Sequence, residues 1–171
     1  MGNYCVRNVG GVVRTRDINL TNNSKERIDF TKLEWKNTKP YIPKVEEGFV
    51  IKVYDGDTIT VATSFEWEPE TAYRFSVRIL GIDTPEKRTK DENEKYVAEK
   101  AKDFVSEKIL RKFVVLRNVS TDKYGRLLAD VYPSDSNISI GEELIKNKLA
   151  VKYDGGTKKT PDNWREYYES K

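Results

Sequence analysis

The feature that most limits the fold of this chain is a series of five short segments with the composition of β-strands. They cover residues 49–54, 58–61, 73–80, 113–116 and 126–132. In the third segment Phe75, Val77 and Ile79 occupy alternate positions, which is the period of a strand with one buried face. Arg78 falls on the opposite face. An Asp-Gly pair after the first segment is typical of a tight hairpin turn.

Helices are predicted around these strands. Residues 91–110 repeat apolar side chains at three- and four-residue intervals, as an amphipathic helix does. Residues 140–149 predict a second helix, and the tail from residue 161, with Trp164 and Tyr167, predicts a short packing helix. This order indicates an α+β fold, a five-stranded OB-fold β-barrel of antiparallel strands with two or three helices.

The chain of 171 residues is long enough for one domain with a hydrophobic core. We expect this domain to span residues 48–171 and residues 1–47 to form an N-terminal extension. Two alternatives stay open for the extension: Trp35 and its apolar neighbours pack on the domain as a clasp, or the extension is a loosely ordered arm. Within the domain, we expect the polar insert at residues 64–72 to interrupt the second strand.

Two absences restrict the chemistry. The chain has no histidine, which excludes an imidazole base, a Ser-His-Asp triad and His-ligated zinc. Its single cysteine, Cys5, excludes intrachain disulfides and thiolate metal sites. Any catalysis must therefore use carboxylates, Arg, Lys, Tyr and hydroxyl groups, and any metal must be a hard cation held by oxygen: calcium, magnesium or manganese. The net charge of +3 carries little weight for the choice of partner.

Four acidic side chains follow strand ends. Asp55 and Asp57 lie at the first hairpin turn, and Asp83 and Glu86 follow the third strand. Carboxylates on neighbouring rigid turns are what a hard cation needs, and Thr84, restricted by the proline after it, could point its carbonyl toward such an ion. Taken singly, each segment is more often only a turn or a helix start.

Arg78 and Arg126 lie in or next to predicted strands. Each is either part of a salt bridge at the barrel rim or a clamp for a phosphate group. Two arginines with a carboxylate-held cation are suited to phosphoryl transfer, because fixed positive charge stabilises the negative charge that gathers in the transition state.

Three segments give a more specific indication. Residues 53–59 (VYDGDTI), 78–86 (RILGIDTPE) and 121–126 (TDKYGR) occur in this order. Together they resemble the three signature segments of the staphylococcal nuclease, or thermonuclease, family. The resemblance covers about residues 49–153 and includes the helical segment 143–150.

The resemblance implies a metal site. Asp57, Asp83 and the backbone carbonyl of Thr84 would ligate one calcium ion, with Asp55 supporting through water. Magnesium and manganese stay open as alternatives, because they also take oxygen ligands.

The resemblance also implies roles in the reaction. Glu86 would position or deprotonate the attacking water, and Arg78 and Arg126 would grip the scissile phosphate. Lys123 and Tyr124 would contact the neighbouring phosphate or nucleoside. The implied reaction is calcium-dependent hydrolysis of the P–O5′ bond of DNA or RNA, which leaves 3′-phosphate ends.

The chain departs from the family pattern at three places. The insert at residues 64–72 carries Trp67 among glutamates, which would repel a phosphate backbone. Residues 87–90 are basic and would either guide a nucleic-acid strand or form a solvated loop. The segment after Tyr153 diverges, so this tyrosine is only a candidate for stacking on a base.

The favoured hypothesis is thus an enzyme that acts on DNA or RNA as a monomer. The main alternative is a non-catalytic nucleic-acid-binding OB-fold module, and a third is a structural module in which the same charges form salt bridges. The complete acidic set favours the enzyme over the binding module. The clustering of four carboxylates argues against the structural module, because without a cation they would repel each other.

The N-terminus offers a possible membrane anchor. Gly2 and Cys5 are positioned for myristate and palmitate, although Val6 stands where Ser or Thr is preferred. The alternative is an ordinary start of the chain. Neither a signal peptide nor a transmembrane segment is predicted, so we expect an intracellular, soluble protein unless it is lipidated.

Overall fold

The computed structural model describes residues 28–170. The chain divides into two compact units, residues 1–40 and 41–171, and each is described by itself. In the first unit, two short 3-10 turns cover Phe30–Lys32 and Trp35–Asn37. Gly2 and Cys5, the predicted lipidation sites, lie outside the described residues.

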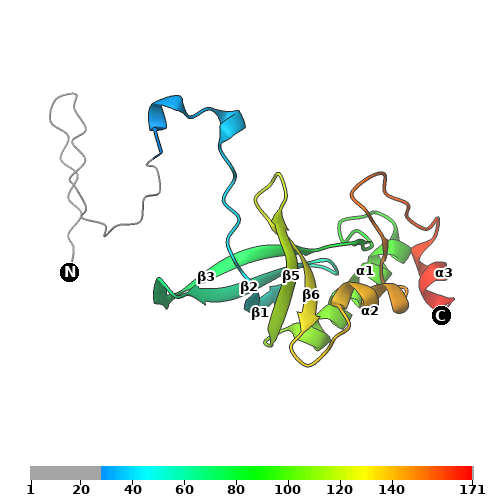
Figure 1. Cartoon of the computed structure of the whole chain (residues 1–171). Helices are drawn as coiled ribbons and strands as arrows, with labels where there is room; N and C mark the ends of the chain where they lie inside the picture. The colour runs from blue at the N-terminus through cyan, green and yellow to red at the C-terminus, as the bar shows by residue number, and fades with distance from the viewer. Residues whose placement is uncertain (1–27, 171) are drawn as a thin grey trace. The chain divides into compact units, whose positions relative to one another are not determined.

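Five strands of the second unit form a closed barrel, which confirms the predicted fold class. They are β1 (Glu47–Val53), β2 (Thr58–Phe65), β3 (Glu68–Ile79), β5 (Phe113–Thr121) and β6 (Leu127–Pro133). Around the barrel they follow the order β1-β2-β3-β6-β5 (Figure 1). The alternation of apolar residues places Val50, Ile59, Val61, Val77 and Val114 inside, each with 0% of its surface exposed.

One seam of the barrel differs from the prediction. Four neighbouring strand pairs are antiparallel, but β3 pairs with β6 in parallel, with Val77 opposite Leu127 and Ile79 opposite Ala129. The expectation of five antiparallel strands is therefore wrong at this seam. Parallel neighbours require a long crossover, and here the chain passes through a helix and β5 between the two strands.

The insert at residues 64–72 forms a hairpin and does not interrupt the second strand. β2 continues to Phe65, the chain turns at residues 66–67, and β3 begins at Glu68, opposite Phe65. Phe65 stacks on Trp67 with ring centroids 5.4 Å apart, and Tyr73 lies 5.5 Å from Trp67. Such aromatic pairs stabilise adjacent strands, which explains why a segment that looks polar is ordered as a hairpin. The hairpin extends away from the helices (Figure 1).

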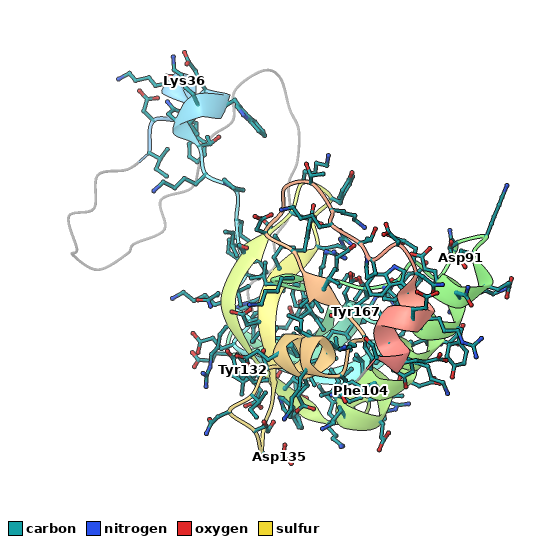
Figure 2. All side chains as sticks on the ribbon, turned by 90° about the vertical axis from the view of Figure 1, so that its right-hand side faces the viewer. Lys36, Asp91, Phe104, Tyr132, Asp135 and Tyr167 are labelled. Atoms are coloured by element: carbon teal, nitrogen blue, oxygen red, sulfur yellow. The ribbon has the colours of Figure 1, made fainter. Side chains whose placement is uncertain are left out.

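The helices cover the other end of the barrel. Helix α1 spans Glu92–Ile109, α2 spans Ile140–Lys146 and α3 spans Trp164–Glu169. The N–H of Asn93 donates to the side chain of Asp91 (labelled in Figure 2), which caps α1. The apolar face of α1 is buried through Val97, Ala101, Val105 and Ile109. Phe104 of α1 and Tyr167 of α3, both labelled in Figure 2, pack against the same core.

Two short strands complete the fold beside the barrel. β4 (Ile82–Asp83) pairs antiparallel with β7 (Val151–Lys152). Helix α2 ends three residues earlier than predicted, because the backbone takes a positive φ of 54° at Lys148 before entering β7. Within residues 28–170, none of the helices is long and apolar enough to span a bilayer.

Candidate active site

The Asp-Gly-Asp turn between β1 and β2 holds its acidic side chains by local hydrogen bonds. The N–H of Asp57 donates to Oδ1 of Asp55 at 3.2 Å, and the hydroxyl of Thr58 donates to Oδ1 of Asp57 at 2.8 Å. The N–H of Ile79 donates to the carbonyl of Asp57 at 2.8 Å, which ties the turn to β3. The side chain of Asp57 is thereby fixed and is only 6% exposed.

Gly56 brings this turn against two other segments. A Cβ atom at position 56 would lie 2.8 Å from Cβ of Ala101 and 3.0 Å from Cγ2 of Thr84. These separations are shorter than side chains tolerate, so only glycine fits between α1 and the segment after β4 without a shift. The packing of Gly56 therefore fixes Asp57 relative to Thr84 and the adjacent Asp83.

Asp83 is positioned by the two-residue ladder of β4 and β7. Asp83 lies opposite Val151, and the N–H of Tyr153 donates to the carbonyl of Gly81 at 2.9 Å. The whole of Asp83 is 2% exposed and Thr84 is 4% exposed. A segment late in the sequence thus holds this buried carboxylate in place.

Arg78 links the two buried carboxylates. Its Nη1 donates to Oδ2 of Asp57 in a close ion pair, and its Nη2 lies 3.4 Å from Oδ1 of Asp83 and 3.4 Å from the carbonyl of Ile82. Both terminal nitrogens belong to one planar group, so the two carboxylates converge on the same small volume. Of the two alternatives for Arg78, the structure contains the salt bridge; a phosphate contact stays a prediction.

The positive charge of Arg78 does not fully offset the effect of burial on the pKa of Asp57. Burial raises the pKa of Asp57, the nearby guanidinium of Arg78 lowers it, and the charge of Asp55 raises it again. The net result is a pKa above the ordinary value of an aspartate. A buried carboxylate in this condition favours the arrival of further positive charge.

The oxygen atoms of Asp57, Asp83 and Thr84 suit a hard cation that takes its remaining ligands from water. Within residues 28–170, no three acidic or cysteine side chains converge into a ready-made metal cage. Asp57 and Asp83 nonetheless share one guanidinium, and Thr84 directly follows Asp83 in the chain. Two carboxylates, a backbone carbonyl and water form an oxygen ligand set that calcium accepts. The residues present therefore fit such an ion.

Glu86 lies at the edge of this group and contacts a lysine that the sequence analysis did not single out. The side chain of Glu86 is 66% exposed, and its Oε1 accepts from Nζ of Lys158 at 2.9 Å. The same Nζ lies 2.9 Å from Oδ1 of Asp83. Burial lowers the pKa of Lys158, but the hydrogen bonds to Asp83 and Glu86 outweigh it, and the pKa lies above its usual value. Nothing in the sequence pattern links these positions.

Arg126 is held by Asp122, a second residue to which the sequence assigned no role. Its Nε donates to Oδ2 of Asp122 at 2.7 Å, while the N–H groups of Tyr124 and Arg126 donate to Oδ1 of Asp122 at 2.8 and 2.9 Å. Burial raises the pKa of Asp122, but these hydrogen bonds together lower it by more, and the net pKa is below the ordinary value of an aspartate. An aspartate whose side chain accepts from the N–H groups two and four residues later forms an Asx turn. Asp122 ahead of a turn segment is typical of this motif, so the sequence did contain a signal for its role.

The structure places Arg126 beside the strand that neighbours β3, the strand of Arg78. It directly precedes β6, whose Leu128 pairs with Arg78 of β3. Asp57 and Asp83 each contact Arg78, whereas Arg126 stands just before the strand that neighbours β3. The ion pair with Asp122 holds Arg126, and its guanidinium also lies over the ring of Tyr124, 5.9 Å from the ring centroid.

The predicted substrate-contacting residues lie outside the group of Asp57, Arg78 and Asp83. The ring of Tyr124 is 74% exposed, with Nζ of Lys123 5.1 Å from its centroid. The hydroxyl of Tyr153 donates to the carbonyl of Gly156 at 3.2 Å. Residues 87, 88 and 90 of the basic stretch are exposed.

Comparison with known proteins finds relatives that match part of this chain. An uncharacterized protein of Methanocaldococcus jannaschii is 33% identical over 62% of this chain and 58% of its own length. A probable endonuclease of Schizosaccharomyces pombe is 38% identical over 47% of this chain and 37% of its own. An uncharacterized endonuclease of Haemophilus influenzae is 33% identical over 61% and 51%. The chain thus matches less than two thirds of each of these relatives.

The family model described as "Staphylococcal nuclease homologue" matches residues 76–170, which is more than half of the chain. This range contains Arg78, Asp83, Glu86 and Arg126, and the barrel supplies Asp57 from the preceding hairpin. The chain therefore belongs to the staphylococcal nuclease homologue family.

Proposed function

We propose that this protein is a calcium-dependent nuclease that hydrolyses the P–O5′ bond of DNA or RNA and leaves 3′-phosphate ends. The observation that carries the proposal is the contact of one guanidinium, Arg78, with two buried carboxylates, Asp57 and Asp83. Several relatives are named as endonucleases, which supports the same reaction class.

In this proposal Asp57, Asp83 and the carbonyl of Thr84 hold the cation, and Asp55 supports it through water. When bound, calcium supplies positive charge next to the phosphate and helps to orient it. The raised pKa of Asp57 supports a cation here, because burial has left that carboxylate short of compensating charge. Magnesium and manganese are the alternatives to be compared with calcium.

Arg78 and Arg126 bind the scissile phosphate. Arg78 lies against both carboxylates, so a phosphate that reaches Arg78 is also beside the proposed cation ligands. Arg126 uses Nε for Asp122, which leaves its two terminal NH₂ groups as donors for a phosphate. Fixed donors of this kind stabilise the charge of the transition state more than that of the ground state.

Glu86 acts on the attacking water. It either orients the water or accepts its proton as the oxygen attacks phosphorus; the P–O5′ bond then breaks and the leaving 5′ oxygen acquires a proton from solvent. Its exposure is consistent with contact to a solvent-derived nucleophile. Lys123 and the exposed ring of Tyr124 contact the neighbouring phosphate or nucleoside, and Tyr153 is a further candidate for stacking on a base.

Digestion of plasmid, single-stranded DNA and RNA tests the proposal. Each substrate is incubated with calcium, magnesium, manganese or EDTA, and the product ends are analysed for a phosphatase-sensitive 3′-phosphate. We expect cleavage with calcium, none with EDTA, and 3′-phosphate ends. Binding of the same nucleic acids without cleavage under any of the cations would instead identify a non-catalytic binding module.

A further inference from the structure

Lys158 reaches the candidate site from a loop between β7 and α3. Its Nζ lies 2.9 Å from Oδ1 of Asp83 and 2.9 Å from Oε1 of Glu86, although Lys158 and Glu86 are 72 residues apart in the sequence. One ammonium group therefore bridges a proposed cation ligand and the proposed water-activating residue. A compact ammonium with three donors is the protein group that most closely substitutes for a bound cation.

Two protein cations meet at the same oxygen of Asp83. Besides Lys158 at 2.9 Å, Nη2 of Arg78 lies 3.4 Å from Oδ1. The two cations differ in how firmly they are held: the side chain of Arg78 is 19% exposed and lies on a barrel strand, whereas that of Lys158 is 45% exposed and lies in residues 154–160, outside any helix or strand. Lys158 is therefore the one that can leave at low cost.

We propose that Lys158 is a built-in competitor of the divalent cation. Its single positive charge partly offsets the charges of Asp83 and Glu86 while no cation is bound, and it has to release Asp83 before that carboxylate ligates a cation. This inference rests on the proposed function, because it takes Asp83 as a cation ligand. Its consequence is that Lys158 weakens the affinity of the site for calcium and so sets the calcium concentration at which the site fills.

Calcium titration of the full chain by isothermal titration calorimetry tests the competition without any substrate. The variants are Lys158→Gln and, as the matched control, Lys159→Gln, which removes the same charge from the exposed neighbouring residue. We expect Lys158→Gln to bind calcium on the order of tenfold more tightly than the control, since a like charge a few ångströms from the ion is removed and partial exposure limits the gain. Lys159→Gln should stay close to wild type.

Thermal unfolding in EDTA provides a second measurement. Without a cation, Lys158→Gln should melt at a lower temperature than Lys159→Gln, because Asp83 loses a counterion. In saturating calcium the two variants should melt at the same temperature, or Lys158→Gln at a higher one. Loss of melting temperature in both conditions alike would mean that Lys158 only stabilises the loop.

Calcium affinity of Lys158→Gln equal to or weaker than that of Lys159→Gln would overturn the inference, as would failure of all three proteins to bind calcium. A different result would contradict the proposed function: wild-type protein that binds nucleic acid but does not cleave it with any of the three cations. Equal calcium affinities alongside normal cleavage would reject the role of Lys158 alone.

Discussion

Gly56 of the Asp-Gly-Asp turn lies directly against Ala101 of helix α1, so that a Cβ on Gly56 would stand 2.8 Å from the Cβ of Ala101. Through this contact the helix, although distant in sequence, sets the position of the turn that carries Asp57. Stability and the geometry of the candidate site should therefore depend on the same contact.

Substitution of Gly56 by alanine should push the turn away from α1. We expect Gly56→Ala to lower the free energy of unfolding by about 1–3 kcal/mol, the usual cost of overpacking, and to reduce nuclease activity strongly. Urea denaturation and a digestion assay provide the two readouts. Adding Ala101→Gly should recover part of the loss, even though glycine within a helix itself costs about 1 kcal/mol. If the effects of the two substitutions on the free energy of unfolding simply add, the two side chains do not clash directly.

Removal of Arg78 should affect both stability and activity. Arg78→Ala leaves Asp57 and Asp83 buried without their shared counterion, a change that typically costs about 3–5 kcal/mol. We therefore expect a marked drop in melting temperature in EDTA and a larger rise on adding calcium than wild type shows. Activity should fall by about 10²–10³-fold. Arg78→Lys is the informative companion, since it restores one charge without the planar fork that reaches both Asp57 and Asp83. Full activity in Arg78→Lys would show that a single positive charge is sufficient at this position.

Glu86 should behave differently, because it is exposed. We expect Glu86→Gln to unfold at nearly the same urea concentration as wild type and to lose about 10²–10⁴-fold in rate, as when a general base or a water-orienting group is removed. Glu70→Gln on the β2–β3 hairpin makes the same chemical change at another exposed position and is the control. Comparable rates for the two variants would remove Glu86 from the mechanism.

Asp122 should give the protein an acid-sensitive contribution to stability. Its pKa is lowered in the folded protein, so the unfolded chain binds the proton more readily. The stabilisation is present above the unfolded pKa of about 3.9 and is lost as the pH falls through the lower folded pKa. Asp122→Asn should thus lower the melting temperature at pH 7, and its difference from wild type should shrink below about pH 4. An equal difference at pH 7 and pH 3 would argue against the ion pair.

The same substitution should also reduce activity through Arg126. Asparagine retains the acceptor for the backbone N–H groups of Tyr124 and Arg126 but loses the charge that holds Nε. Steady-state kinetics at pH 7 should show a smaller loss than Arg126→Ala. Wild-type kinetics for Asp122→Asn would show that Arg126 is oriented by other contacts.

Local sequence patterns predicted the parts of the fold in which short-range rules decide. The alternation from Phe75 to Ile79 fixed the face on which Arg78 lies, and the three- and four-residue spacing located helix α1 to within one residue at each end. The hairpin at residues 64–72 was missed because its glutamates concealed the aromatic pairs that stabilise it. Composition reports polarity but not which side chains meet across two strands.

The contacts that build the site depend on tertiary structure. The parallel seam between β3 and β6 depends on how the barrel closes, and no local pattern encodes it. The bridge from Lys158 to Glu86 joins residues 72 positions apart. Asp57 and Asp83 could be proposed as partners because each follows a strand. That Arg78 is their common counterion follows only from the way the strands pack side by side.

Because β4 pairs with β7, the last part of the chain holds Asp83, a residue from the middle of the sequence, in place. Asp83 is braced by Val151, while Trp164, 4% exposed, anchors the following helix in the same core. A shortened chain that stops at residue 150 would retain every barrel strand and the four acidic side chains of the candidate site, Asp55, Asp57, Asp83 and Glu86. It would nevertheless lack β7, which pairs with Asp83 and keeps it buried. A fragment that contains every motif residue can therefore still fail to form the candidate site.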